Sequence, residues 1–135
     1  MDAPITAHSF LNFLAYAGIG IGVLVLAALA LVLITPHREL SLIREGNSAA
    51  ATAFAGTLIG LALPLHSAIS NSVSLIDAAI WGAVSVVVQA VAFLLARLVA
   101  PKLSQQITLN QTAAGIFSAG VSVSVGLINA AAMTP

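Results

Sequence analysis

Four long stretches of the chain contain no charged residue, and this feature constrains the fold more than any other. They are Phe10–Ile34, Ala49–Leu65, Ala78–Ala96 and Ala113–Met133, with 25, 17, 19 and 21 residues. A helix of about 20 apolar residues crosses the hydrocarbon core of a bilayer, which is about 30 Å thick. The four stretches therefore predict four transmembrane helices and an all-α membrane protein.

The composition excludes the other classes of protein. Only 6% of the 135 residues are charged and 60% are hydrophobic, whereas a soluble domain carries about 25% charged residues. The chain has no cysteine, which excludes a disulfide-stabilised scaffold. A membrane β-barrel is excluded because its strands alternate in polarity and span only about ten residues. We therefore expect a single integral membrane domain over residues 1–135.

The basic residues predict how the chain crosses the membrane. Arg38, Arg44, Arg97 and Lys102 all fall in, or at the ends of, the loops after the first and third stretches. Basic loops face the cytoplasm in most membrane proteins, so both termini are expected in the periplasm. No acidic pair lies inside a stretch, which disfavours a proton relay.

The two halves of the chain resemble each other. Repeat 1 covers about residues 10–66 and repeat 2 about residues 77–134. Matching pairs at an offset of 63 or 64 residues are Asn47 and Asn110, Ser48 and Thr112, and Gly56 and Gly120. This pattern predicts two tandem helical hairpins related by a parallel pseudo-repeat, with its axis along the membrane normal.

Three residues predict where helices begin and end. Ser48 and Thr112 each precede an apolar stretch, so each is expected to cap a helix N-terminus with its hydroxyl. Pro64 lies at the end of the second stretch, and its missing N–H is expected to break the last turn there.

Several motifs occur in order along most of the chain. They are Thr35–Glu39, Asn47–Ala50, Phe54–Gly60, Thr112–Gly115 and Asn129–Thr134. In these motifs the chain resembles the YjfL family of small bacterial inner-membrane proteins, which have two tandem two-helix units and no known function. The resemblance implies residence in the inner membrane and no established catalytic residue. Through neighbouring genes it also implies a cytoplasmic membrane-stress protein as a partner. The chain departs from the family pattern at Arg38, where an amide is usual.

Gln89 is the most informative polar residue within a stretch. It lies near the middle of the third stretch, where a polar side chain costs most, and Ser85 lies one turn earlier on the same helix face. One interpretation is a hydrogen bond between helices, and the other is contact with an ion or substrate.

Small residues recur at four-residue spacing in two of the stretches. Gly56 and Gly60 form one such pair, and Ser118 and Ser122 form another. Small residues let membrane helices approach closely. These faces therefore indicate packing within one chain, contact with a second copy, or the lining of a narrow path.

The loop after the first stretch supplies a candidate docking surface for a cytoplasmic partner. Its residues are His37, Arg38, Glu39 and Arg44. The alternative is that this loop and its counterpart near Lys102 are ordinary connections or short helices at the membrane surface.

No residue pattern indicates catalysis, a cofactor or a metal. The histidines are expected on both sides of the bilayer and lack metal-ligand spacing, and no nucleophile motif is present. We expect a non-enzymatic membrane-integrity or adaptor component that oligomerises; the alternative is a small ion or solute channel or transporter. The expected partners are the lipid bilayer, a second copy and a membrane-stress protein, without nucleic acid.

Overall fold

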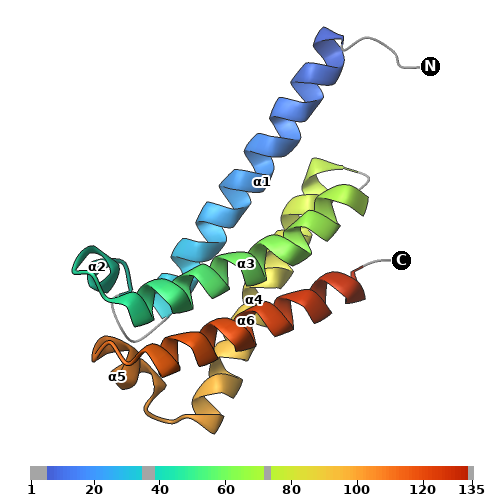
Figure 1. The fold of residues 1–135 in the computed structure, drawn as a ribbon. Helices are drawn as coiled ribbons and strands as arrows, with labels where there is room; N and C mark the ends of the chain where they lie inside the picture. The colour runs from blue at the N-terminus through green and yellow to red at the C-terminus, as the bar shows by residue number, and fades with distance from the viewer. Residues whose placement is uncertain (1–5, 35–38, 72–73, 134–135) are drawn as a thin grey trace.

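The computed structural model describes residues 6–34, 39–71 and 74–133, and these ranges contain helices and no strands (Figure 1). The long helices are α1 (Ala7–Ile34), α3 (Ser48–Asn71), α4 (Leu75–Val99) and α6 (Thr112–Ala132). The short helices are α2 (Glu39–Arg44) and α5 (Leu103–Thr108). All four long helices are long and apolar enough to cross a membrane, which confirms the predicted all-α fold with four spans.

Helix α3 is longer than the sequence indicates. It continues through Pro64 without interruption and ends at Asn71, so the predicted break at Pro64 is wrong. The helix tolerates the proline because a side chain of α4 donates a hydrogen bond to the carbonyl of Gly60.

The helix starts also differ from the prediction. The Asn47 side chain, rather than Ser48, caps α3, because its Oδ1 accepts a hydrogen bond from the Ala50 N–H at 2.8 Å. Ser48 is already the first helical residue, and an N-cap lies one position earlier. Thr112 likewise begins α6, after Gln111 at the cap position without a side-chain bond. Both hydroxyl-cap predictions are therefore wrong.

Helices α3 and α6 lie side by side and form the most extensive helix contact of the fold (Figure 1). Helix α4 packs against both of them, and α1 packs against α3 and α4. The N-terminal half of α1 projects beyond the other helices in Figure 1, and residues 6–15 are all exposed. In a bilayer these apolar side chains contact lipid, because the exterior of a membrane protein is solvated by hydrocarbon.

Asparagine side chains join the start of α3 to the short helix α5 at one end of the bundle. Asn47 Nδ2 donates to the carbonyl oxygens of Ile107 at 2.9 Å and Thr108 at 3.2 Å, at the end of α5. Asn110 Oδ1 accepts from the Ala49 N–H at 3.1 Å, at the start of α3. The order long, short, long helix thus occurs twice, while the symmetry axis of the repeat and the division into repeats remain predictions.

Candidate functional site

Gln89 lies where three of the long helices meet. Its side chain is 3% exposed, and its Nε2 donates hydrogen bonds to the carbonyl oxygens of Gly60 in α3 and Ser122 in α6, both at 3.1 Å. A single amide from α4 therefore joins α3 and α6.

Pro64 explains why this amide is needed. In an α-helix the carbonyl of residue 60 accepts a hydrogen bond from the N–H of residue 64, but proline has no N–H. The Gly60 carbonyl is thereby deprived of its partner inside α3, and Gln89 supplies the missing donor. A proline inside a membrane helix is tolerated when a neighbouring group satisfies the freed carbonyl in this way.

Glycines bring α3 and α6 into backbone contact around this junction. A Cβ built on Gly56 would lie 2.3 Å from the Ala119 Cα, and one built on Gly126 would lie 2.4 Å from the Gly60 carbonyl oxygen. A Cβ on Gly60 would lie 2.4 Å from the Ser122 carbonyl oxygen. No larger residue fits at these three positions without moving a backbone, so Gly56 and Gly60 serve packing within the chain.

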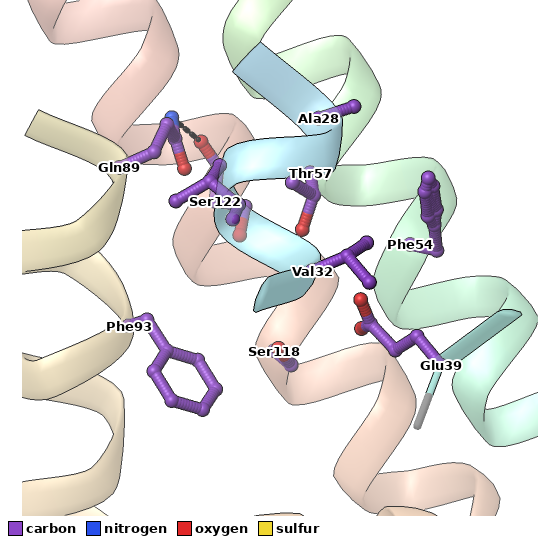
Figure 2. Close-up of a pocket in the computed structure, with 10 residues that line it drawn as sticks. Ala28, Val32, Glu39, Phe54, Thr57, Gln89, Phe93, Ser118 and Ser122 are labelled. Atoms are coloured by element: carbon purple, nitrogen blue, oxygen red, sulfur yellow. Dashed lines mark hydrogen bonds between the residues drawn. The ribbon is translucent and has the colours of Figure 1, made fainter. Parts of the chain in front are cut away.

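A small polar cavity lies beside Gln89 (Figure 2). Its volume is about 20 Å³, and about 10–15 Å³ suffices for one water molecule. Its polar lining residues are Glu39, Thr57, Gln89, Ser118 and Ser122, and its apolar ones are Ala28, Leu31, Val32, Phe54 and Phe93. These residues come from five helices, so the cavity lies inside the bundle.

The burial of the Glu39 carboxylate in this cavity was not expected from the sequence. Glu39 was expected on an exposed docking surface, but its side chain is 6% exposed and points into the cavity in Figure 2. The reason is the path of the chain: Glu39 is the first residue of α2, which folds against α3. A charged residue after the end of a span is therefore turned back into the bundle.

The other candidate residues separate into two groups. The Ser118 side chain is 7% exposed and lines the cavity together with Ser122. Ser85 does not line it; its hydroxyl donates to the Trp81 carbonyl oxygen of its own helix at 2.9 Å. Arg44 is exposed at the end of α2, and the predicted docking residues His37 and Arg38 lie outside the described residues.

Sequence reasoning missed Thr57 and the cavity position of Glu39. Thr57 donates its hydroxyl to the Ala53 carbonyl oxygen at 3.1 Å within α3, a bond that many membrane threonines make. Its place three residues before Gly60 was the available signal, because residues three apart share a helix face.

Comparison with known proteins gives the chain its family. The family model described as Domain of Unknown Function (DUF350) matches residues 5–133. A curated relative, the "UPF0719 inner membrane protein YjfL" of Escherichia coli strain K12, is 42% identical over 126 residues, covering 93% of this chain and 96% of the relative. The protein of the same name from Escherichia coli O157:H7 matches equally. No solved structure matches the chain.

These matches confirm the resemblance to the YjfL family that the motifs indicated. Together with the four membrane-length helices, they make the chain a multi-pass membrane protein whose relatives are named as inner-membrane proteins. The chain belongs to the DUF350 family.

Proposed function

We propose that the protein is a small, non-enzymatic inner-membrane channel or transporter for a small inorganic ion or proton. The observation that carries this proposal is the convergence of the Glu39 carboxylate and the Gln89 amide on one cavity inside the helix bundle. An ionisable side chain buried in a membrane bundle is costly, and such residues commonly mark ion or proton pathways.

The sequence alone favoured an adaptor or membrane-integrity component, and this proposal favours the channel or transporter instead. A non-enzymatic adaptor was preferred because no charge lies within the four apolar stretches. The cavity supplies such a charge from outside those stretches, because Glu39 enters the bundle from α2. The volume of about 20 Å³ argues against an organic solute in this conformation, since even a small organic molecule exceeds one water molecule in size.

For the orientation, we propose that both termini face the periplasm. Arg44, Arg97 and Lys102 are all exposed, and they lie in or beside the short helices at one end of the bundle (Figure 1). A basic end facing the cytoplasm agrees with the positive-inside rule.

Flux measurements in proteoliposomes test the proposed transport. The purified full-length protein is reconstituted, and uptake of protons, Na⁺, K⁺ and Cl⁻ is followed under imposed gradients. We expect flux of one of these ions, and its loss in Glu39→Gln, which removes the charge and keeps the size. Glu45→Gln is the matched control, because Glu45 is an exposed carboxylate at the same end of the bundle. Absence of flux in the wild type under every gradient, or equal flux in both variants, would refute the proposal.

A second candidate, the oligomeric adaptor or membrane-integrity component, is favoured by the exposed polar end of the bundle. Arg44, Glu45 and Lys102 are all exposed there, and they could contact a cytoplasmic membrane-stress protein. Gly18 and Gly22 leave open space on α1, with nothing within 4 Å of a built Cβ, which suits close contact with a second copy. Co-purification of a partner that is lost when residues 38–47 are scrambled would support this role; an unchanged set of partners would exclude that segment as the docking surface.

A further inference from the structure

We propose that a second cavity, at the end of the bundle opposite α2 and α5, binds the primary ammonium group of an ethanolamine phospholipid. Helices α3 and α6 end there and α4 begins there (Figure 1). The volume of the cavity is about 150 Å³. It is lined by residues from the adjoining ends of these three helices: Ser67, Ala68, Asn71, Asp77, Trp81 and Met133. The cavity is separate from the one beside Gln89, and its occupation does not depend on the proposed transport.

The polar side chains from α3 present acceptor oxygens. The Ser67 hydroxyl donates its proton to the Ala130 carbonyl oxygen at 3.0 Å, so lone pairs of the hydroxyl oxygen remain available. The Asn71 Nδ2 donates to the Ser67 carbonyl oxygen at 2.9 Å, and a carbonyl oxygen never donates. This bond makes the other branch of the Asn71 amide the acceptor Oδ1. Both α3 side chains therefore use their donors on backbone carbonyls and have acceptors left for a ligand that donates.

Charge at this end of the bundle favours a cation. Asp77 is the ionisable residue among those that line the cavity, and an ionised carboxylate accepts hydrogen bonds without donating any. Two helices, α3 and α6, end beside it, and the C-terminal end of a helix carries a partial negative charge. The exposed residues Arg44, Arg97 and Lys102 lie at the opposite end of the bundle, so they do not neutralise Asp77.

Trp81 adds an aromatic ring and gives access from the membrane. It follows Asp77 by four residues, so the two side chains share one face of α4, and it is 40% exposed. A cation over an indole ring is attracted to it, and tryptophan is enriched where the membrane meets water. Ile76 and Ile80, on the same turns of α4, are exposed, as is typical of a helix in contact with lipid. A lipid headgroup can therefore enter the cavity from the surrounding bilayer.

Size and hydrogen bonding select among ammonium groups. A cavity of about 150 Å³ holds a molecule as large as benzene, which is sufficient for an ethanolamine group. A primary ammonium has three N–H donors, and Ser67, Asn71 and Asp77 supply acceptors for them. A quaternary ammonium such as choline has no N–H and binds typically in a cage of aromatic side chains, whereas Trp81 is the one aromatic residue of this lining. The lining therefore favours ethanolamine over choline.

A fluorescence titration of the purified full-length protein in detergent tests the site. Trp81 is the single tryptophan of the chain and lines the cavity, so its emission reports on the occupant. Phosphatidylethanolamine, phosphatidylcholine and phosphatidylglycerol with identical acyl chains are added in turn. We expect a saturable change with phosphatidylethanolamine and binding at least about tenfold weaker for the other two, because they lack the charge-assisted N–H donors.

Substitution of the carboxylate provides the matched comparison. Asp77→Asn keeps the size of the side chain and should weaken binding of phosphatidylethanolamine about tenfold, because it removes the charge from the ion pair with the ammonium. Glu45→Gln is the control, since Glu45 is an exposed carboxylate at the opposite end of the bundle, and it should bind as the wild type does. If Asp77→Asn does not fold, Asn71→Ala takes its place, because Asn71 is exposed at the last position of α3.

Three outcomes would overturn the site. One is equal binding of the three lipids, and another is equal binding of phosphatidylethanolamine by Asp77→Asn and Glu45→Gln. The third is an unchanged Trp81 emission together with no retained phosphatidylethanolamine in native mass spectrometry of the same samples. Free ethanolamine is a separate arm of the titration: if it binds as tightly as the lipid does, the occupant is a soluble amine and the lipid is excluded.

Discussion

The pairing of Pro64 with Gln89 predicts a specific coupling between two substitutions. Gln89→Leu removes the side-chain amide that donates a hydrogen bond to the Gly60 carbonyl oxygen. In the wild type this carbonyl has no replacement donor, because residue 64 is proline. In a Pro64→Ala background, the new N–H of residue 64 can bond the same carbonyl within α3. The loss caused by Gln89→Leu should therefore be smaller in that background.

The expected magnitude follows from the two bonds that Gln89 makes. A buried carbonyl left without a donor costs about 1–3 kcal/mol, and a hydrogen bond between membrane helices contributes about 0.6–2 kcal/mol. The Ser122 carbonyl retains the N–H of residue 126 in its own helix, so losing its bond from Gln89 costs less. We expect Gln89→Leu to lower the free energy of unfolding by about 2 kcal/mol, and Pro64→Ala to reduce this loss by about 1 kcal/mol.

The assay is a double-mutant cycle in detergent micelles. Unfolding by sodium dodecyl sulfate is followed by the fluorescence of Trp81, the single tryptophan of the chain. Ser85→Ala serves as the control in place of Gln89→Leu, because the Ser85 hydroxyl donates to the Trp81 carbonyl oxygen of its own helix, one turn away from Gln89. The changes in the free energy of unfolding caused by Ser85→Ala and by Pro64→Ala should add. Equal losses from Gln89→Leu in both backgrounds would refute the idea that Gln89 substitutes for the missing N–H.

Three further predictions concern packing, the asparagine contacts and orientation. Gly126→Ala should lower the free energy of unfolding by about 1–3 kcal/mol, because the new Cβ would lie 2.4 Å from the Gly60 carbonyl oxygen of α3. The control is Gly120→Ala, whose new Cβ meets nothing within 4 Å. This control should be neutral or stabilising in the same assay. Asn47→Ala should cost about 2 kcal/mol, since it removes the α3 cap and two bonds to α5; faster amide hydrogen exchange in α5 would be the signature, and unchanged exchange would contradict it. With cysteine introduced in turn at Ser41 and Ser74, a membrane-impermeant thiol reagent should label only position 74 in intact cells, and the reverse pattern would invert the proposed orientation.

The membrane helices were predictable because their signal is local. A charge-free run of about 20 residues must cross the bilayer as a helix regardless of what surrounds it. The same reasoning failed at Pro64, because the effect of a proline depends on whether another helix satisfies the freed carbonyl. That donor lies 25 residues further along the chain, at Gln89, and no local pattern connects the two positions.

The position of Glu39 was not predictable for a related reason. A charged residue just after an apolar run is normally solvated, and nothing near Glu39 in the sequence indicates otherwise. Its burial depends on how α2 folds against α3, which is a tertiary contact. The Asn47 cap, in contrast, was within reach of sequence reasoning, since asparagine is among the best N-cap residues and precedes the helix by one position.

Of the two interpretations of Gln89 that the sequence left open, the structure contains the hydrogen bonds between helices, and contact with an ion or substrate stays a prediction. An amide has one donor end and one acceptor end, and both hydrogen bonds described above for Gln89 use the donor end. The donor end satisfies the Gly60 carbonyl, which Pro64 has deprived of its N–H. Fixing the donor end there leaves the acceptor end for the cavity that Glu39 also lines. The missing N–H of Pro64 in α3 thus fixes the orientation of an amide of α4 that lines the cavity. A substitution at Pro64 should therefore disturb that amide even though residue 64 does not line the cavity.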